Sequence, residues 1–201
     1  MAADALLAGL VLAGGRSTRM RRDKATLEID GETQLARAFR LLRRHAPRCF
    51  VSLRPDQVAD PERARWPQIV DRLSDIGPAA GILAALATLP DHAWLVVAVD
   101  LPLLDAATLA RLVGGRDPAA LATAFRSAED GLPEPLCAIW EPASAAPLAA
   151  AVGAGRSCPR KFLLGHQTRL LELEERSALA NVNTPEDYAA AVARAGTRGR
   201  A

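Results

Sequence analysis

Two short, unbroken apolar runs constrain the fold of this chain most strongly. The first, ALLAGLVLA over Ala5–Ala13, ends in Gly14-Gly15, and the second, AWLVVAV over Ala93–Val99, ends abruptly at Asp100. Runs of this length without alternation are typical of strands buried on both faces of a parallel sheet. Ligands of such sheets bind outside the carboxyl ends of the strands. We therefore expect Gly14 and Asp100 to lie at a ligand-binding edge.

The stretches around these runs alternate between helical and extended patterns. Between the runs, the sequence predicts a helix over Gln34–His45 capped by Thr33, a strand over Arg48–Leu53 and a buried helix over Ala79–Leu89. After the second run it predicts helices over Asp105–Val113, Ala143–Val152, Arg160–Leu164 and Pro185–Ala195, and strands over Ala119–Phe125, Pro135–Trp140 and Thr168–Leu173. This alternation predicts an α/β fold, a single Rossmann-like three-layer domain with a mostly parallel central sheet. We expect the domain to cover residues 1–196 and a frayed tail to cover residues 197–201.

Composition and charge narrow the partners and the compartment. A chain of 201 residues, 50% of them hydrophobic, is large enough for one substantial core. A net charge of +2 does not suggest a nucleic-acid partner, although local clusters can bind a small polyanion. The three cysteines form no CxxC pair and the histidines show no zinc-site spacing, which is typical of a cytoplasmic protein with reduced thiols. The N-terminal apolar run is too short to span a membrane and no basic residues precede it, so no membrane partner is expected.

The segment after the first run has the composition of a phosphate-binding loop. Glycines directly after a buried strand let backbone N–H groups approach a phosphate, and the cations that follow offset its charge. Those cations are Arg16, Arg19, Arg21, Arg22 and Lys24. The segment fits neither the GxGxxG nor the GxxxxGK[ST] pattern. On the glycines alone, a plain turn beside a solvated basic patch explains the segment equally well.

The whole string LAGGRSTRMRRDKA closely resembles the LAGGxSxRMGxDKA signature of the nucleotidyltransferases that include the molybdenum cofactor guanylyltransferases (MobA). The resemblance implies the nucleotide-diphospho-sugar transferase type of fold and a loop that wraps a triphosphate. By position it assigns nucleotide contacts to Leu12, Ala13, Gly14, Gly15 and Lys24, and catalytic charge neutralisation to Arg19 and Lys24. Arg21 stands where the family usually has glycine, which would either add a phosphate contact or alter the loop's flexibility.

Asp100 is a carboxylate at the end of a strand that otherwise has no polar residue. Mg²⁺ prefers one or two carboxylates together with phosphate oxygens and water. An isolated aspartate before Pro102 is more often a turn residue. The string VDLP, however, resembles the family's DxP metal motif, which implies that Asp100 binds Mg²⁺, contacts the nucleotide and is catalytic.

A third segment, DRLSDIGPAAG over Asp71–Gly81, resembles the DxxxxxGPLAG segment of the guanylyltransferases, with Ala79 replacing leucine. The resemblance implies that Asp71 contacts the nucleotide and that the stretch from Gly77 borders the base or ribose. Ser52 stands near a family asparagine that touches the nucleotide, and we assign it to the nucleotide side as well. Without the resemblance, this segment is only a loop before a helix.

The acceptor side is assigned to the C-terminal half. The string Asn181-Val182-Asn183-Thr184-Pro185 resembles the family's NxNTPEE ending, which implies that Asn181 or Asn183 completes the metal or cofactor site. A structural turn explains the two asparagines equally well. Arg156 begins a basic cluster that the resemblance places on the molybdopterin side, where a solvated helix start is the alternative. The stretch 131–136 is assigned weakly to the second-substrate pocket.

The resemblance covers about residues 10–190 and implies transfer of GMP from GTP to the terminal phosphate of the molybdopterin cofactor, with release of pyrophosphate. The expected cofactor is Mg²⁺. The expected protein partners are other proteins of molybdenum cofactor biosynthesis, through transient contacts. The alternatives are a cytidylyltransferase for the same cofactor, a sugar- or alditol-phosphate nucleotidyltransferase, and a nucleotide-binding module without turnover. The GPAAG segment favours GTP, and intact Asp100 and Lys24 favour an enzyme.

Overall fold

The computed structural model describes residues 5–15, 23–73, 75–182 and 184–198, and its centre is a seven-stranded sheet. The strand order is β5-β4-β1-β6-β8-β7-β9. These strands are β1 (Leu7–Leu12), β4 (Arg48–Leu53), β5 (Gln68–Val70), β6 (Ala93–Ala98), β7 (Ala122–Arg126), β8 (Pro133–Trp140) and β9 (Thr168–Leu171). All neighbouring pairs are parallel except those of β8, which is antiparallel to both β6 and β7. The expectation of an α/β fold with a mostly parallel sheet is confirmed.

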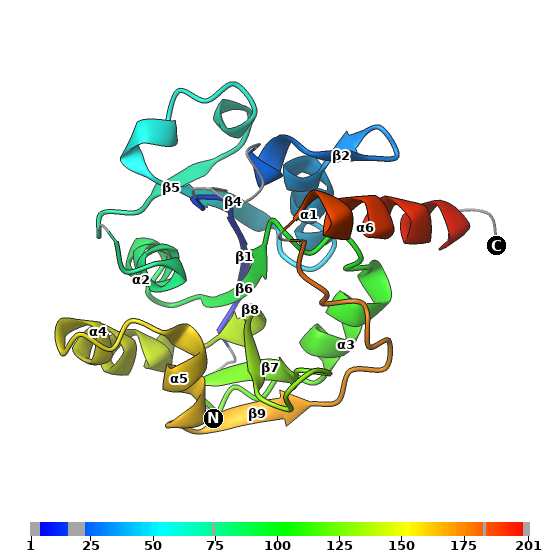
Figure 1. Cartoon of the computed structure of the whole chain (residues 1–201). Helices are drawn as coiled ribbons and strands as arrows, with labels where there is room; N and C mark the ends of the chain where they lie inside the picture. The colour runs from blue at the N-terminus through cyan, green and yellow to red at the C-terminus, as the bar shows by residue number, and fades with distance from the viewer. Residues whose placement is uncertain (1–4, 16–22, 74, 183, 199–201) are drawn as a thin grey trace.

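Helices cover both faces of the sheet (Figure 1). On one face lie α2 (Pro78–Thr88), α4 (Ala145–Gly153) and α5 (Pro159–Leu164), and on the other lie α1 (Gln34–Leu42) and α3 (Ala106–Gly114). The last helix, α6 (Pro185–Arg198), lies beside α1 and the small hairpin of β2 (Glu28–Ile29) and β3 (Glu32–Thr33). Among the described helices, none combines the length and the apolarity that a membrane crossing requires.

The two central strands, β1 and β6, contribute side chains to two separate hydrophobic cores, one on each face of the sheet. Alternate residues of a strand point to opposite faces of the sheet. Accordingly, Val11 and Val97 pack with α1 and α3, whereas Leu10 and Val96 pack with α2 and α4. All of these side chains are fully buried. The unbroken apolar character of the two runs therefore reflects burial on both faces.

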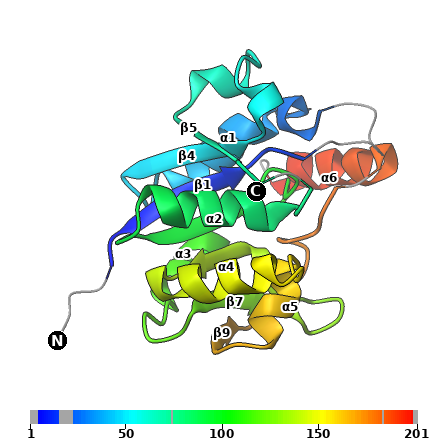
Figure 2. The same cartoon turned by 90° about the vertical axis from the view of Figure 1, so that its left-hand side faces the viewer.

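The register of β1 and β6 brings their carboxyl ends together. Leu12 lies opposite Ala98, and the amide of Val99 donates to the carbonyl of Leu12 at 3.2 Å. The chain therefore leaves β1 towards Gly14 and leaves β6 towards Asp100 at the same edge. Figure 2 shows the strands from the side. The expectation of a shared edge is confirmed.

Several elements differ from the sequence-based expectation. The strands β2, β3 and β5 were not predicted, because two or three residues are too few to show a period. Asp30 and Gly31 form the hairpin turn between β2 and β3, with φ of 53° and 76°. At the C-terminus, α6 continues through Arg198, so the expected tail is wrong for residues 197 and 198.

Candidate active site

The glycines after β1 stand at the entrance of the predicted loop. A Cβ on Gly14 would lie 3.3 Å from Asp71 Oδ2 and 3.5 Å from the amide of Arg54, whereas Gly15 has open space around it. Arg54 donates from Nη1 to the carbonyl of Gly14. Leu12 is the last residue of β1, and the buried Ala13 follows it directly. Arg19 lies outside the described residues, so its expected contact stays a prediction.

Lys24 and Asp100 lie together at this edge although they are 76 residues apart in the sequence. Lys24 begins a short 3-10 helix, Lys24–Thr26, whose N-cap is Asp23. Its Nζ lies 2.9 Å from Asp100 Oδ2, and the two side chains are 15% and 23% exposed. The amide of Val182 donates to the carbonyl of Asp100 at 3.1 Å. An ammonium and a carboxylate that still reach solvent are thus placed together at the end of β6.

Asp71 and Ser52 form a second polar pair on the other side of Gly14. Ser52 is 1% exposed and donates from its hydroxyl to Asp71 Oδ1 at 2.7 Å. Burial raises the pKa of the Asp71 carboxyl, although the Ser52 hydrogen bond and the nearby Arg54 oppose the rise. In the structure the buried hydroxyl of Ser52 binds the Asp71 carboxyl. The contact expected between Ser52 and the nucleotide stays a prediction.

Gly77 begins α2 in a backbone conformation that glycine adopts readily. Its φ and ψ are 67° and −148°, a region in which a Cβ is strongly disfavoured. Pro78 follows as the first helical residue, where its missing N–H costs nothing. The turn therefore fixes how the amino end of α2 approaches the site.

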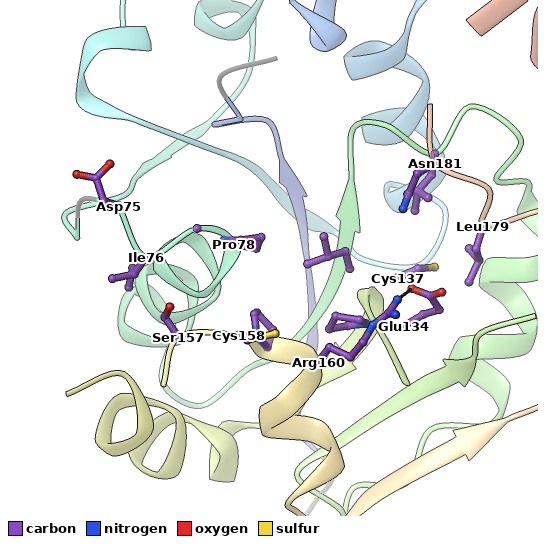
Figure 3. Close-up of a pocket in the computed structure, with 15 residues that line it drawn as sticks. Asp75, Ile76, Pro78, Glu134, Cys137, Ser157, Cys158, Arg160, Leu179 and Asn181 are labelled. Carbon is purple, nitrogen blue, oxygen red and sulfur yellow. Dashed lines mark hydrogen bonds and ion pairs between the residues drawn. The ribbon is translucent and has the colours of Figure 1, made fainter. Parts of the chain in front are cut away.

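A pocket of about 470 Å³ opens next to this turn and between α2, α5 and β8 (Figure 3). Figure 3 shows Asp75, Ile76 and Pro78 on the α2 side and Ser157, Cys158 and Arg160 on the α5 side. Leu101 also lines it and directly follows Asp100 in the sequence. The remaining lining residues are Gly77, Glu134, Pro135, Leu136, Cys137, Pro159, Leu179 and Asn181.

The pocket includes only part of the set expected on the acceptor side. Asn181 lines it, and three residues of the stretch 131–136 do so as well. Arg156 is exposed and is not among the described lining residues; Arg160, from the same basic cluster, takes that place. Arg160 donates to Asp130 and to Glu134, both at 2.9 Å, so carboxylates already balance its charge. Asn183 lies outside the described residues.

A family model described as the MobA-like NTP transferase domain matches residues 9–170 of this sequence. The chain belongs to this family. A probable molybdenum cofactor guanylyltransferase from Opitutus terrae is similar to it, with 36% identity over 190 residues that cover 90% of this chain and 92% of the relative. A molybdenum cofactor biosynthesis bifunctional protein from Synechocystis is 34% identical over 182 residues, and there the chain spans about half of the relative, 52%.

Solved structures agree with the fold of this MobA-like chain. A molybdopterin-guanine dinucleotide biosynthesis protein A from Archaeoglobus fulgidus superposes with a TM-score of 0.77 at 23% identity, over 94% of this chain and 99% of that one. A manganese complex of a Mycobacterium tuberculosis protein gives a TM-score of 0.70 at 22% identity, over 95% and 100% of the two chains. The protein is accordingly a nucleotidyltransferase of the MobA-like family.

A divalent cation fits the residues at the end of β6. Within the described residues, no group of three or more His, Cys, Asp or Glu side chains is arranged to hold a metal. Asp100 Oδ2 faces Lys24, while none of the described residues donates to Oδ1. A single carboxylate with a free oxygen suits Mg²⁺. In nucleotide sites the protein holds this ion through one or two carboxylates, and phosphate oxygens and water supply its other ligands.

Two arginines of the MobA-like domain were missed by sequence reasoning. Arg54 and Arg63 lie in the segment after β4 and bind backbone carbonyls at the start of the loop, Gly14 and Ala13 respectively. An arginine that binds a carbonyl leaves no pattern in the sequence, because any residue can supply the carbonyl. No signal in this chain would have distinguished them from its many solvated arginines.

Proposed function

We propose that this protein transfers GMP from GTP to the terminal phosphate of the molybdopterin cofactor and releases pyrophosphate. The observation that carries the proposal is the Lys24–Asp100 pair at the carboxyl end of β6, beside the end of β1 that Gly14 and Gly15 follow, while Leu101, the residue after Asp100, lines the 470 Å³ pocket. A transferase needs this arrangement, because two substrates must meet at one reactive centre. The names of the relatives that align over about 90% of both chains support the choice of substrates.

The nucleotide belongs on the loop side of the pair. Gly14 and Gly15 offer backbone amides that no described residue accepts from, and Lys24 offers a cation for the triphosphate. Asp71 lies close to Gly14 and accepts hydrogen bonds, so it suits a ribose hydroxyl or a donor on the base. The GPAAG segment resembles the guanine type: its first residue, Gly77, lines the 470 Å³ pocket, and its last, Gly81, packs on Ser52 and Leu12 on the loop side.

The acceptor belongs in the pocket on the other side. Its described polar lining combines Asn181 with Asp75, Glu134 and Arg160. Carboxylates and an amide suit the amino and ring N–H donors of a pterin. They do not suit a phosphate, so the acceptor's phosphate would point out of this lining and towards Lys24 and Asp100.

The chemistry requires charge neutralisation more than covalent assistance. An oxygen of the acceptor's terminal phosphate forms a bond to the α-phosphorus of GTP, and the bond from that phosphorus to the pyrophosphate oxygen breaks. A phosphate is already ionised at neutral pH, so no general base is needed. Lys24 would stabilise the charge that grows on pyrophosphate. A Mg²⁺ ion on Asp100 would supply further neutralisation of the phosphate oxygens.

The nucleotide preference can be tested by thermal shift with GTP, CTP, ATP and UTP, each with Mg²⁺. A ligand at 100 times its Kd stabilises the native state by about 2.7 kcal/mol. We expect GTP to raise the Tm most. A larger shift with CTP would favour the cytidylyltransferase alternative, and the absence of any shift would contradict nucleotide binding.

The reaction itself can be tested by pyrophosphate release with GTP and the molybdopterin cofactor. We expect release that depends on both substrates, together with formation of the guanine dinucleotide. Nucleotide binding without release, under conditions in which a known guanylyltransferase turns over, would instead support a binding module. Release with a sugar phosphate in place of the pterin would change the assigned acceptor.

A further inference from the structure

Arg63 is a buried cation that the reaction above does not use. Its side chain is 1% exposed, yet it lies in a 3-10 helix, Arg63–Arg65, on the surface segment between β4 and β5. Its Nε and Nη2 donate to the carbonyl of Ala13 at 3.1 and 2.7 Å. Its Nη1 and Nη2 donate to the two carboxylate oxygens of Asp23 at 2.6 and 2.9 Å. One guanidinium thus joins the residue before Gly14 to the residue before Lys24.

The bond to Ala13 determines which way the next amide points. In a trans peptide the carbonyl and the following N–H point in opposite directions, and the described residues contain no cis peptide bond. Because the carbonyl of Ala13 points to Arg63, the amide of Gly14 points away from it. Arg54 binds the carbonyl of Gly14 and turns the amide of Gly15 in the same way. None of the described residues accepts a hydrogen bond from either amide.

The bond to Asp23 determines where Lys24 begins. Asp23 Oδ1 also accepts from the amide of Ala25 at 3.0 Å and so caps the short helix that carries Lys24. Arg63 therefore holds the cap, the cap holds the helix, and the helix presents the ammonium of Lys24 to Asp100. One side chain thus links Ala13 directly to Asp23.

Arg63 is itself held firmly. Asp60 Oδ1 accepts from the Arg63 amide at 3.0 Å and lies 3.1 Å from Nη1. Glu62, its neighbour, accepts from the hydroxyl of Thr33 at 2.7 Å and joins the segment to α1. Burial lowers the pKa of the guanidinium, but Asp23 and Asp60 more than offset this and raise it. The group therefore stays charged at every pH at which the protein is folded.

We propose that Arg63 is a positioning residue for nucleotide binding, which orients the Gly14 amide and the Lys24 ammonium towards one phosphate chain. The inference rests on the proposed function, because it assumes that the glycine turn and Lys24 bind a triphosphate. A lysine at this position would keep the charge but lose the planar fork, and one ammonium cannot reproduce paired bonds to a carbonyl and a carboxylate.

A second arginine, Arg116, makes similar hydrogen bonds far from the candidate site and serves as the matched control for Arg63. Arg116, whose side chain is 14% exposed, donates to both carboxylate oxygens of Glu141 at 2.7 and 2.8 Å and to the carbonyl of Ala5 at 2.8 Å. It therefore makes the same kind of bonds as Arg63 at the opposite end of β1. Arg116→Lys removes a buried fork without touching the candidate site.

The experiment compares the wild type with Arg63→Lys, Asp23→Asn and Arg116→Lys at a temperature at which circular dichroism shows each to be folded. Binding of GTP with Mg²⁺ is measured by calorimetry, and kcat and KM by pyrophosphate release. We expect Arg63→Lys to raise the Kd and lower kcat/KM by about ten-fold or more, the size of one lost charge-assisted hydrogen bond. Arg116→Lys should stay within about three-fold of the wild type while losing a comparable amount of thermal stability.

Asp23→Asn keeps the cap, since asparagine accepts from the Ala25 amide as aspartate does, and weakens only the link to Arg63. It should shift GTP affinity in the same direction, and it decides the question if Arg63→Lys does not fold. Wild-type GTP affinity in both folded variants, or in Asp23→Asn alone if Arg63→Lys does not fold, would overturn the inference and leave the proposed function intact. An equal loss in Arg116→Lys would also overturn it, as an effect of stability. A wild type that binds no GTP would contradict both.

Discussion

At the scale of single residues, the site pairs side chains whose charges are needed later for a substrate. Lys24 and Asp100 neutralise each other at 2.9 Å, and both remain partly open to solvent. Because solvent still reaches both groups, we expect a pair of this kind to contribute only about 1 kcal/mol to stability. The pair therefore matters less for stability than for position. It holds a cation and a carboxylate at the edge where β1 and β6 end, where the proposed nucleotide and its metal would bind.

Asp100→Asn keeps the size of the side chain and removes the charge. We expect GMP transfer to fall by about two orders of magnitude or more, or about 2.7 kcal/mol in the barrier, because the metal loses its carboxylate. The Tm without ligand should change by a few degrees at most. Transfer must be measured at limiting and saturating Mg²⁺.

Asp105→Asn is the matched control for this change. Asp105 caps α3 by accepting from the Thr108 amide at 2.8 Å, and asparagine is an equally good cap. It should retain transfer at the wild-type rate. If Asp100→Asn transferred GMP as fast as Asp105→Asn, Asp100 would be a turn residue and the metal assignment would be wrong.

Asp71→Asn tests a carboxyl whose pKa is raised by burial. A raised pKa in the folded state means that ionising Asp71 destabilises the protein. This cost is absent below the unfolded pKa of about 4 and is fully present once the pH exceeds the folded pKa. The variant should therefore be at least as stable as the wild type at pH 7, with the difference vanishing near pH 4, and it should bind GTP more weakly. Urea unfolding against pH and calorimetry measure the two effects, and a variant that lost stability at pH 7 without losing GTP affinity would make Asp71 structural.

The sequence predicted these residues unevenly, for physical reasons. Gly14 and Asp100 could be placed because each is the first residue after an unbroken apolar run, which marks the end of a buried strand. Lys24 required the family resemblance, since its distance from Asp100 along the chain hides the contact. Ser52 was assigned by its position near a family asparagine, and its burial under α2 could not be predicted because it depends on how closely Gly81 packs. Arg63 could not be predicted at all, because its main partner is a backbone carbonyl.

At the scale of elements, the approach of α2 to the sheet supports the nucleotide side. Gly81 lies where α2 crosses β1 and β4, and a Cβ there would overlap Ser52 Oγ and come within 2.7 Å of Leu12 Cδ2. The helices and main strands could be predicted from their apolar periods. The reversed direction of β8 could not, because a buried strand shows the same pattern whichever way it runs.

Gly81→Ala should push α2 away from the sheet and disturb the Ser52–Asp71 hydrogen bond. We expect a loss of about 1–3 kcal/mol in the free energy of unfolding and weaker GTP binding. Gly153→Ala is the matched control, since a Cβ at that end of α4 meets no atom within 4 Å, and alanine should be neutral or stabilising by up to about 1 kcal/mol. Chemical denaturation and calorimetry separate the two, and equal stabilities of the two variants would contradict the close packing of α2.

At the scale of the whole molecule, two of the three cysteines report on the core that the sheet forms with α1 and α3, and the third reports on the exposed side of the pocket. Cys49 and Cys137 are buried, which raises the pKa of the Cys49 thiol to about 11 and that of Cys137 further. Cys158 is exposed and lines the pocket. Thiol reactivity follows exposure and thiolate content, so the three should react at very different rates.

A bulky maleimide should label the native protein once, at Cys158, and three times after denaturation. Because the label fills the pocket, we expect it to reduce transfer to the acceptor while GTP still raises the Tm. Mass spectrometry and the two assays measure this, with reagent-treated Cys158→Ser as the control for reaction elsewhere. Full transfer by the labelled protein would show that the acceptor does not enter this pocket.

The bond from Val182 to the carbonyl of Asp100 has a consequence for the order in which the protein is made. Translation delivers the glycine turn, Lys24 and Asp100 first, whereas Leu179 and Asn181 of the pocket emerge only after the last strand of the sheet, β9. The last segment also closes a small core in which Val182 and Ala191 pack with Leu27 and Leu103. A nascent or prematurely terminated chain can therefore form its parallel strands and still lack a finished acceptor pocket. Synthesis in this order makes the proposed acceptor pocket a later part of the site to form than the glycine turn and the Lys24–Asp100 pair.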